Sequence, residues 1–374
     1  MNILFLDSID KETYGGMEEW IKLVSDGLTA RGHTVAVAGR TGSRFLRRIA
    51  ANKTVPTLEL DISGDFHPET IAKIKRYLEE NNIDLLVVNF NKDVRLGGLA
   101  ARLTRDVRVV WSVGLDITKD SVVHKWLTPK LIDGVIVPSE SLKSQITQLG
   151  YIKEEIVNVI PIGIPDRPFK RPDPAAADAL RKKYHLPKDA VVAVTTARFV
   201  EQKGHVHLID AASELIGAFP KLRFLLLGSG PLEESLRNRM KATGVDNNFA
   251  FAGMLDDVDA ELAGADLMVH PSIEEPFGIA VLEGMRAGLP IVASRVGGIP
   301  EVVGEDDVAL MTRPGSPDSL VNAVSKLAGD SDLRAYMGQR ARRRFEMEFQ
   351  AETMFERIEN YLQSIAREAA HGKT

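Results

Sequence analysis

The sequence of 374 residues contains no cysteine. Disulfide frameworks, thiolate metal sites and cysteine nucleophiles are therefore excluded. It also lacks any apolar run near the ~20 residues that a membrane-spanning helix needs. The first residues, MNILFLDS, have no basic segment and reach an acidic residue at Asp7, which is unlike a signal peptide. We therefore expect a cytoplasmic protein.

An overall excess of positive charge is also missing. The net charge is −5, and apolar and charged residues make up 44% and 26% of the chain, close to the average of soluble globular proteins. General nucleic-acid binders are typically basic, so we expect no nucleic-acid partner. Single hydrophobic cores stop growing near ~250–300 residues, so the length predicts more than one domain.

Short β-branched segments alternate with helical patterns along the whole chain, which predicts an α/β fold of doubly wound parallel sheets covered by helices. The predicted strands are 3–6, 34–38, 85–88, 108–112, 134–137, 157–160, 191–195, 224–227, 248–251, 267–269, 290–293 and 308–311. The predicted helices include 69–80, 140–148, 205–219, 232–243, 277–287, 317–327, 333–345 and 350–369.

A proline-rich segment divides the chain. Residues 161–174, PIGIPDRPFKRPDP, contain five prolines, which fix φ and remove backbone donors, so we interpret this segment as a linker. It separates a predicted N-terminal domain, 1–165, from a C-terminal domain, 166–349. The last helix, in 350–374, carries an apolar stripe and is followed by no strand, so this stripe must be buried elsewhere.

The most specific candidate site is EPFGIAVLE, which runs from Glu275 to Glu283. Pro276 suits a first helical turn, so the sequence predicts a helix that starts there and offers free N–H groups to an anion. In a continuous helix the two carboxylates would lie ~12 Å apart along the axis, about the length of a ribose-diphosphate-sugar unit. The alternative is an ordinary first-turn glutamate and a solvated Glu283.

Two cations, Arg198 and Lys203, follow the first strand of the second half. The arginine fork and the lysine point charge suit phosphates, and they would neutralise charge on a departing diphosphate. Glycines occupy two strand-to-helix turns, at Gly15-Gly16 and in LLLGSGP, and let the backbone approach a phosphate. Solvated cations and plain tight turns are the alternatives for these motifs when each is taken alone.

Together, these features resemble retaining glycosyltransferase family 4 (glycosyl transferases group 1), whose GT-B fold has two Rossmann-like domains facing a central cleft. The resemblance covers nearly the whole chain and rests on PSIEEPFGIAVLEGMRAGLPIVAS, ARFVEQKGH, LLLGSGP, the N-terminal GG and VGGIPEVV. It implies an enzyme that uses a nucleotide-diphosphate sugar as substrate, bound mainly by the second domain, with no metal and no other cofactor. It also implies that the last helix crosses back to the N-terminal domain.

The resemblance assigns roles to matching residues. Arg198 and Lys203 would hold the diphosphate, Glu275 would contact the sugar and Glu283 the ribose. The other donor-binding residues that it implies are Gly15, Gly16, Gly228, Gly230, Met254, Gly278, Ile279 and Ala280. One departure is a histidine that many members carry after the strand 108–112, where this chain reads WSVGLD. The polar groups left for the acceptor side are Asn89, Asn91, Asp116 and Lys119.

No acidic residue occurs between Asp26 and Glu59, where Arg44, Arg47 and Arg48 alternate with apolar residues. As a helix, this segment would resemble interfacial segments that lie on anionic lipid, or it would bind a phosphorylated acceptor. The alternative is a mobile, solvated loop. We therefore expect either no membrane contact or a peripheral one at the inner face of the membrane.

Several polar residues receive a structural interpretation. The D-x-D around Asp257 and Asp259 is expected to cap a helix rather than to bind a divalent metal. His270 is expected to be a buried structural histidine, and His205 lacks partners at metal-ligand spacing.

The sequence therefore predicts a glycosyltransferase that moves a sugar, with UDP as the favoured carrier, to a cell-envelope acceptor such as lipopolysaccharide, glycolipid or polysaccharide. A sugar-nucleotide 2-epimerase of the same fold would need N-terminal carboxylates and histidines aimed at the sugar. A nicotinamide oxidoreductase would need a glycine fingerprint that is missing here. A non-catalytic sugar-binding protein would not need Glu275 and Glu283 together with Arg198 and Lys203.

Overall fold

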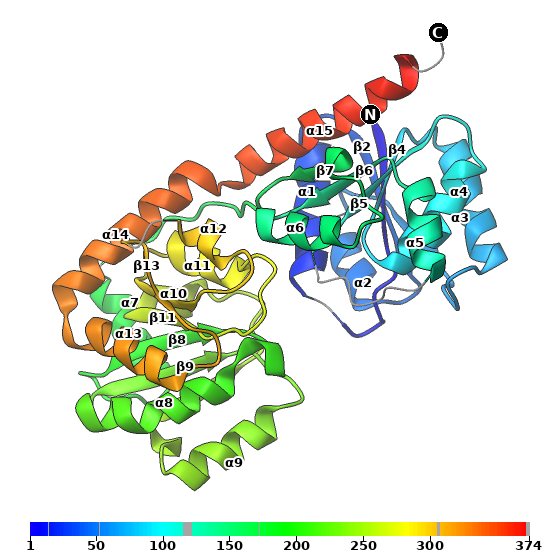
Figure 1. Cartoon of the computed structure of the whole chain (residues 1–374). Coiled ribbons are helices and arrows are strands. Elements are labelled where there is room, and N and C mark those ends of the chain that lie inside the picture. Colours follow the sequence, from blue (N-terminus) through cyan, green and yellow to red (C-terminus); the bar gives the residue numbers. More distant parts are fainter. Residues whose placement is uncertain (14, 52, 115–121, 172, 305–306, 372–374) are drawn as a thin grey trace. The chain divides into compact units, whose positions relative to one another are not determined.

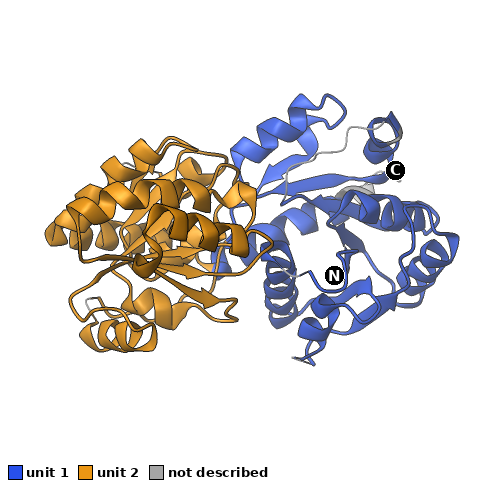
Figure 2. Ribbon diagram, turned by 90° about the horizontal axis from the view of Figure 1, so that it is seen from below, with its two compact units in different colours: residues 1–162, 351–374 blue, residues 163–350 orange. Residues whose placement is uncertain are grey.

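The structure is a computed structural model that describes residues 1–374 except 14, 52, 115–121, 172, 305–306 and 372–374. It divides into two compact units (Figure 2): Met1–Ile162 with Ala351–Thr374, and Gly163–Gln350. The predicted boundaries were residues 165 and 349. Within the described residues, no helix is long and apolar enough to span a bilayer.

The first unit is built on a seven-stranded parallel sheet in the order β3-β2-β1-β4-β5-β6-β7. Its strands are β1 (Asn2–Asp7), β2 (Thr34–Arg40), β3 (Thr57–Leu60), β4 (Leu85–Val88), β5 (Arg108–Ser112), β6 (Gly134–Val137) and β7 (Val157–Val159). The chain reverses its direction of winding between β1 and β4, which are paired in register Phe5↔Val87. In open α/β sheets, this switch point is where ligands bind, beyond the carboxyl ends of the strands.

Helices cover both faces of this sheet (Figure 1). They are α1 (Gly16–Ala30), α2 (Arg44–Ala51), α3 (Pro68–Glu80), α4 (Asn91–Arg102), α5 (Val122–Leu131), α6 (Glu140–Gln148) and α15 (Ala351–His371), with a 3₁₀ turn η1 (Glu154–Ile156). Strand side chains alternate between the faces. Leu4 and Leu6 therefore join the core formed with α3–α6, whereas Phe5 packs edge-on against Trp20 of α1 at 6.5 Å.

The last helix, α15, packs within the first unit. Its apolar stripe, Met354, Ile358, Leu362 and Ile365, is buried. A Cβ on Gly27 would lie 2.5 Å from the Phe355 ring, so the absent side chain in α1 lets α15 approach closely. Tyr361 donates a hydrogen bond to the Ile156 carbonyl at 3.0 Å. These contacts explain where a helix with no following strand buries its apolar face.

The basic segment of the first unit forms α2, so the mobile-loop alternative is wrong. Its apolar residues Phe45, Leu46 and Ile49 are at most 4% exposed, because α2 packs on β2 and β3. They are not available to lipid, and the interpretation of this helix as an interfacial segment with an apolar face is therefore wrong as well.

The second unit is a six-stranded parallel sheet in the order β10-β9-β8-β11-β12-β13. Its strands are β8 (Val191–Thr196), β9 (Leu222–Leu227), β10 (Phe249–Gly253), β11 (Leu267–His270), β12 (Ile291–Ser294) and β13 (Ala309–Thr312). The described helices are α7 (Pro174–Lys183), α8 (His205–Ala218), α9 (Glu233–Thr243), α10 (Asp259–Gly264), α11 (Ile279–Arg286), α12 (Ile299–Val303), α13 (Pro317–Gly329) and α14 (Ser331–Glu348), with 3₁₀ turns η2 (Glu201–Lys203) and η3 (Asp246–Asn248).

The switch point of this second sheet lies between β8 and β11, which are direct neighbours. One buried core contains residues of β8, β9 and β11 together with Leu208 of α8 and Val324 of α13. The loops that follow β8 and β11 therefore emerge side by side from a rigid sheet, at the edge where ligands bind in such folds.

Candidate functional site

The loop after β8 carries both predicted cations and is held by the glycines of the next turn. Gly228 has φ +144°, and a Cβ there would lie 2.0 Å from the Ala197 carbonyl oxygen. At Gly230 a Cβ would lie 2.5 Å from the Phe199 carbonyl oxygen. The Phe199 N–H also donates to Ser229 at 3.0 Å. Because these residues are glycines, the backbone of the turn after β9 packs directly against the loop that carries Arg198.

Arg198 and Lys203 differ in their surroundings. Arg198 is exposed, and its guanidinium has no hydrogen-bond or ion-pair partner among the described residues. Lys203 is the last residue of η2, and its Nζ lies 2.6 Å from Glu275 Oε2. The sequence predicted two phosphate-binding cations; the structure places one against a carboxylate and leaves the other open to an anion.

Glu275 lies in a loop, not in a helix. The prediction of a helix from Pro276 is wrong, because α11 starts at Ile279 after Gly278 at φ +111°. The Glu275 carbonyl accepts from Gly298 N–H at 3.1 Å instead of from the following turn. Gly297, at φ +52°, approaches so closely that a Cβ there would lie 1.8 Å from this carbonyl. The distance between the two glutamates therefore does not follow from helical rise.

The Glu275 carboxylate receives two donors on one oxygen. Oε2 lies 2.6 Å from Lys203 Nζ and 2.8 Å from His270 Nε2. Oε1 has no partner within the described chain. Burial by itself raises the pKa of Glu275, but the hydrogen bond and charge of His270, followed by those of Lys203, lower it to about 2. The group is thus a fixed carboxylate with one acceptor oxygen left for a ligand hydroxyl.

His270 belongs to the site, although its sequence interpretation was structural. It ends β11 and is 1% exposed. Ser272 Oγ lies 3.0 Å from the same Nε2, and His270 Nδ1 is buried without a partner among the described residues. We assign a proton to Nε2, because this nitrogen then donates to the Glu275 carboxylate. Its position at the carboxyl end of a predicted strand is the sequence feature that could have indicated its place in the site.

His205, the first residue of α8, lies in the same neighbourhood. Its ring packs edge-on against Phe199 at 5.0 Å, and neither ring nitrogen has a partner in the described part of the chain. Burial, followed by the charges of His270 and Lys203, lowers its pKa to about 4. His205 is therefore neutral at pH 7 and adds no charge beside Lys203. Gly204, with φ +63°, lets this helix start against the Pro271 carbonyl, which a Cβ would approach to 2.1 Å.

The other predicted donor residues lie at the same edge of this sheet. Ile279 and Ala280 form the first turn of α11, where N–H groups lack helical acceptors. Glu283 lies in the same helix and is half-buried, and Met254, which follows β10, is 51% exposed.

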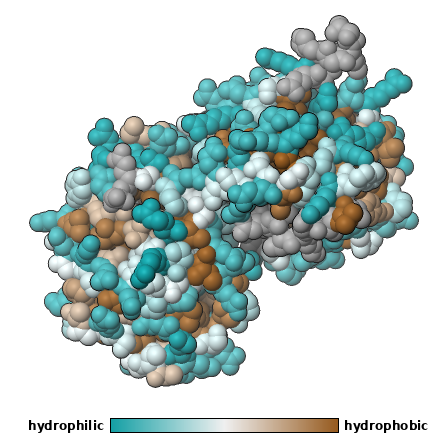
Figure 3. Space-filling view, in the orientation of Figure 1, coloured by the Kyte–Doolittle hydropathy of each residue, from teal (hydrophilic) through white to brown (hydrophobic). Residues whose placement is uncertain are grey.

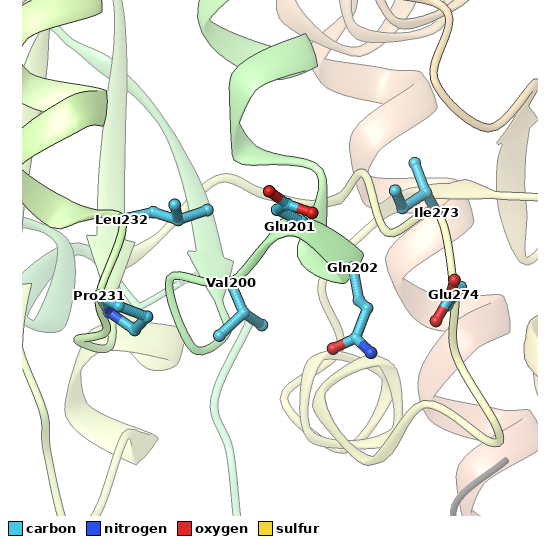
Figure 4. A pocket seen from close by; sticks show the side chains of 7 residues that line it. All are labelled: Val200, Glu201, Gln202, Pro231, Leu232, Ile273 and Glu274. Atoms are coloured by element: carbon cyan, nitrogen blue, oxygen red, sulfur yellow. The ribbon is translucent and has the colours of Figure 1, made fainter. Parts of the chain in front are cut away.

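A hollow of about 460 Å³ adjoins these loops (Figure 4). In the figure, Val200, Glu201 and Gln202 lie between Pro231 with Leu232 on one side and Ile273 with Glu274 on the other. The Gln202 carbonyl accepts from the N–H groups of Ile273 and Glu274 at 2.8 and 3.2 Å. The hollow is lined by sequence neighbours of Lys203 and Glu275 rather than by these residues, and the sequence analysis did not identify it.

At the sheet edge of the first unit, Gly15 caps α1, Gly16 is its first residue and Asn91 is the first residue of α4. The Asn91 Oδ1 atom is buried and has no partner among the described residues. Asp116 and Lys119 lie outside the described residues. Near the position of the family histidine, a Cβ on Gly114 would lie 1.8 Å from Met17 Sδ, so Met17 occupies the space of a side chain there.

The same edge holds buried carboxylates that the sequence analysis did not identify. Asp7 ends β1 and accepts from Asn89 Nδ2 at 2.8 Å. Asp93 accepts from the N–H groups of Ser8 and Phe90 at 3.2 and 2.9 Å. Burial raises the pKa of Asp93 to about 6 and that of Asp7 well above its usual range, with the charges of Asp93 and Glu18 adding to the latter.

The remaining candidates are placed as follows. Arg44 and Arg48 are half-buried on α2, and Arg47 is exposed and donates to the Gly42 carbonyl at 2.6 Å. Asp257 accepts from the N–H of Asp259 at 2.9 Å at the start of α10. Both aspartates pair with Arg167, and no cluster of metal-ligating side chains occurs where the chain is described.

The two doubly wound sheets, with a cation-bearing loop and a buried glutamate at one switch point, define a GT-B protein. Family models match both halves: Glycosyltransferase Family 4 over residues 14–167, and Glycosyl transferases group 1 over 176–344. The chain belongs to this family of glycosyltransferases.

Relatives and solved structures agree with this family. N-acetyl-alpha-D-glucosaminyl L-malate synthase of Bacillus anthracis is 27% identical over 310 residues, 81% of this chain and 80% of that one. A GDP-mannose-dependent phosphatidylinositol monomannoside mannosyltransferase of Corynebacterium glutamicum is 34% identical over 217 residues. It and several other curated relatives are matched over little more than half their length, 56% in its case.

The crystal structure of Anabaena Alr3699/HepE in complex with UDP and glucose has a TM-score of 0.85 at 23% identity. The similarity covers 97% of this chain and 100% of that one. It establishes a shared fold over both units.

Proposed function

We propose that this protein is a retaining glycosyltransferase that moves a sugar from a UDP-sugar to a hydroxyl of a cell-envelope acceptor. Two relatives support the acceptor class: one is named for lipopolysaccharide core biosynthesis and one for phosphatidylinositol monomannoside mannosyl transfer. A solved relative named with UDP and glucose supports the carrier. Another relative is named as GDP-mannose-dependent.

The arrangement that carries this proposal is the Glu275 carboxylate with both donors on Oε2. A carboxylate of lowered pKa, fixed on one oxygen, accepts a sugar hydroxyl on the other without having to lose a proton. Hydrogen bonds to charged groups contribute ~1.5–3 kcal/mol. Glu275 would therefore orient the donor sugar, and Lys203 would hold the carboxylate while it faces the diphosphate.

Arg198 would bind the diphosphate directly. It is exposed and has no partner among the described residues, so binding breaks no existing ion pair. The first turn of α11 would supply N–H groups to the same phosphates. Stabilising charge on the leaving group lowers the barrier to its departure. The acceptor hydroxyl would then attack from the phosphate side, with a donor phosphate oxygen taking its proton.

The acceptor would bind at the carboxyl edge of the first unit. Asn91 supports this, since it is half-buried and is the first residue of α4 at this edge. The 2-epimerase alternative requires carboxylates aimed at the sugar, whereas Asp7 and Asp93 at this edge are fully buried. Incubating the protein with UDP-glucose or UDP-N-acetylglucosamine alone and recording proton NMR separates the two: an epimerised sugar nucleotide would contradict the transferase, and release of UDP with free sugar of retained configuration supports it.

The direct test is the Glu275→Gln variant, which keeps the side chain's size and removes its charge. Transfer from UDP-glucose to an envelope-lipid extract should fall by about 10- to 100-fold. Glu214→Gln, at an exposed position on α8, is the matched control. An unchanged rate in Glu275→Gln would show that the site assignment is wrong.

A further inference from the structure

Large hydrophobic side chains are exposed on one side of the first unit. Those that the structure describes are Phe66, Leu103, Val122 and Trp126, which are 47%, 63%, 82% and 64% exposed. They lie just before α3, at the end of α4 and on α5. The chain buries its other two tryptophans, Trp20 and Trp111, to 5% and 1% exposure, so an exposed Trp126 is an exception within this fold.

Contacts of Arg95 and Arg102 link the elements that carry these residues. The Arg95 guanidinium lies 6.0 Å from the Phe66 ring centre and 3.0 Å from His124 Nδ1 of α5. At the other end, Arg102 Nε donates to the Lys130 carbonyl at 2.9 Å. We call the exposed side chains of Phe66, Arg102, Leu103, Arg105, Val122, Lys125, Trp126 and Lys130 the α4–α5 surface. In the space-filling view, hydrophobic and polar atoms are mixed on the side of this unit where α5 lies (Figures 1 and 3).

Cations surround the apolar side chains of this surface. Arg102, Arg105, Lys125 and Lys130 are all exposed, and Lys130 Nζ lies 3.4 Å from the ring centre of Trp126. Val122 and Trp126 are four residues apart and so share one side of the helix.

The described acidic groups near this surface offset only part of that charge. Asp133 is 14% exposed and pairs with Arg102 and Arg108 at 3.2 and 3.0 Å. Asp65 pairs with Arg95 at 2.6 Å. Asp106 is exposed beside Arg105. The apolar side chains therefore stand mainly among cations, and Lys125 and Lys130 flank Trp126 on α5.

We propose that the α4–α5 surface docks on an anionic phospholipid bilayer. Tryptophan prefers the membrane–water interface, and lysine and arginine around it bind anionic headgroups. A single helix face with one aromatic and few aliphatic side chains inserts shallowly, which predicts reversible, salt-sensitive binding. We favour lipid over a protein groove as the occupant, because the cations of the α4–α5 surface are complementary to a negatively charged bilayer surface.

This docking site differs from the basic helix that the sequence analysis considered. The apolar side chains of α2 are buried in the core, whereas Val122 and Trp126 of α5 are exposed. α5 also begins on the side of the sheet where β5 ends, at the acceptor edge of the first unit. The inference does not depend on the donor site, and vesicle binding without any donor tests it separately from the proposed function.

Co-sedimentation of the whole chain with vesicles tests the proposal. We expect binding to phosphatidylcholine vesicles with 30% phosphatidylglycerol, and at least tenfold weaker binding to phosphatidylcholine alone. Trp126→Ser with Leu103→Ser, and separately Lys125→Glu with Lys130→Glu, should each weaken binding to the anionic vesicles about tenfold or more. Met347→Ser, at a residue of the second unit that is 66% exposed, is the matched apolar control and should bind as the wild type does.

Tryptophan fluorescence gives a readout that unfolding would not mimic. Because Trp20 and Trp111 are buried, anionic vesicles should shift the emission of Trp126 alone to the blue, and brominated lipid should quench it. Trp126→Phe should abolish both changes and leave UDP release from UDP-glucose unchanged. The proposal is overturned if the wild type shows no shift or quenching, if the double variants bind as tightly as the wild type, or if Trp126→Ser instead dissociates an oligomer seen by sedimentation.

Discussion

His270 Nε2 lies 2.8 Å from Glu275 Oε2, and this contact joins the end of β11 to the loop before α11. Lys203 reaches the same oxygen from the loop after β8. Two strands that meet at the switch point of one sheet thus fix a single carboxylate. The geometry explains how a side chain outside any helix or strand is held rigidly enough to orient a ligand.

His270 is accordingly a positioning residue for the proposed reaction. His270→Ala removes one of the two donors to Oε2, so Glu275 should sample other orientations. We expect kcat/KM with UDP-glucose to fall about tenfold, with most of the loss in KM. His270→Gln, which can still donate to the carboxylate, should restore part of this loss. Equal loss in both variants, with unchanged thermal stability, would contradict the positioning role.

A substitution at Gly297 tests whether its close approach holds the loop that carries Glu275. Gly297→Ala combines left-handed backbone with a Cβ placed 1.8 Å from the Glu275 carbonyl oxygen. Gly244 has a similar φ of +71° but no atom within 4 Å of a built Cβ, so Gly244→Ala isolates the backbone strain, of order 1–3 kcal/mol. Denaturant unfolding should show a larger loss for Gly297→Ala, together with weaker donor binding. Equal losses would indicate that the close approach is unimportant.

The buried Asp93 predicts a pH dependence of stability. Its pKa in the folded protein is raised to about 6 from an ordinary value of 3.8. The folded state thus binds the proton more tightly, and this group's contribution is favourable below the ordinary pKa and lost as the pH rises through about 6. Asp93→Asn keeps an acceptor for Ser8 and Phe90, and should stabilise the first unit at pH 8 by up to about 3 kcal/mol.

Thermal unfolding of Asp93→Asn and the wild type at pH 5 and pH 8 measures this effect. The advantage of the variant should be larger at pH 8. Asp10→Asn, at an exposed position in the same unit, is the control. An advantage that is the same at both pH values would show that the burial of Asp93 does not carry the expected penalty.

Much of the fold follows from local patterns. β4, β5 and β6 match the predicted bounds because each is a short, apolar segment buried in a parallel sheet. β3 (Thr57–Leu60) was missed because it is a half-exposed edge strand with a weak pattern. The predicted alternation of strands and helices thus identifies the buried interior strands better than the edges.

The geometry of the site could be predicted from the sequence less well than the fold. Local propensity favours a helix at Pro276, but the hydrogen bond from Gly298 and the left-handed Gly278 hold Glu275 in a loop. The pairing of Lys203 with Glu275 joins residues far apart in the sequence, which no periodicity indicates. His270 and Asp93 look like structural residues until their partners at the strand ends are seen.

The central claim is that the loops after β8 and β11 bind the diphosphate of a nucleotide-sugar. Calorimetric titration of the wild type with UDP, GDP and ADP tests it most directly, alongside the variant Arg198→Ala. Arg223→Ala is the control, because Arg223 lies near the start of β9, at the edge of the sheet opposite the site. The account predicts that UDP binds most tightly, that Arg198→Ala weakens this binding about tenfold or more, and that Arg223→Ala does not. Equal affinity of the wild type and Arg198→Ala for UDP would contradict it.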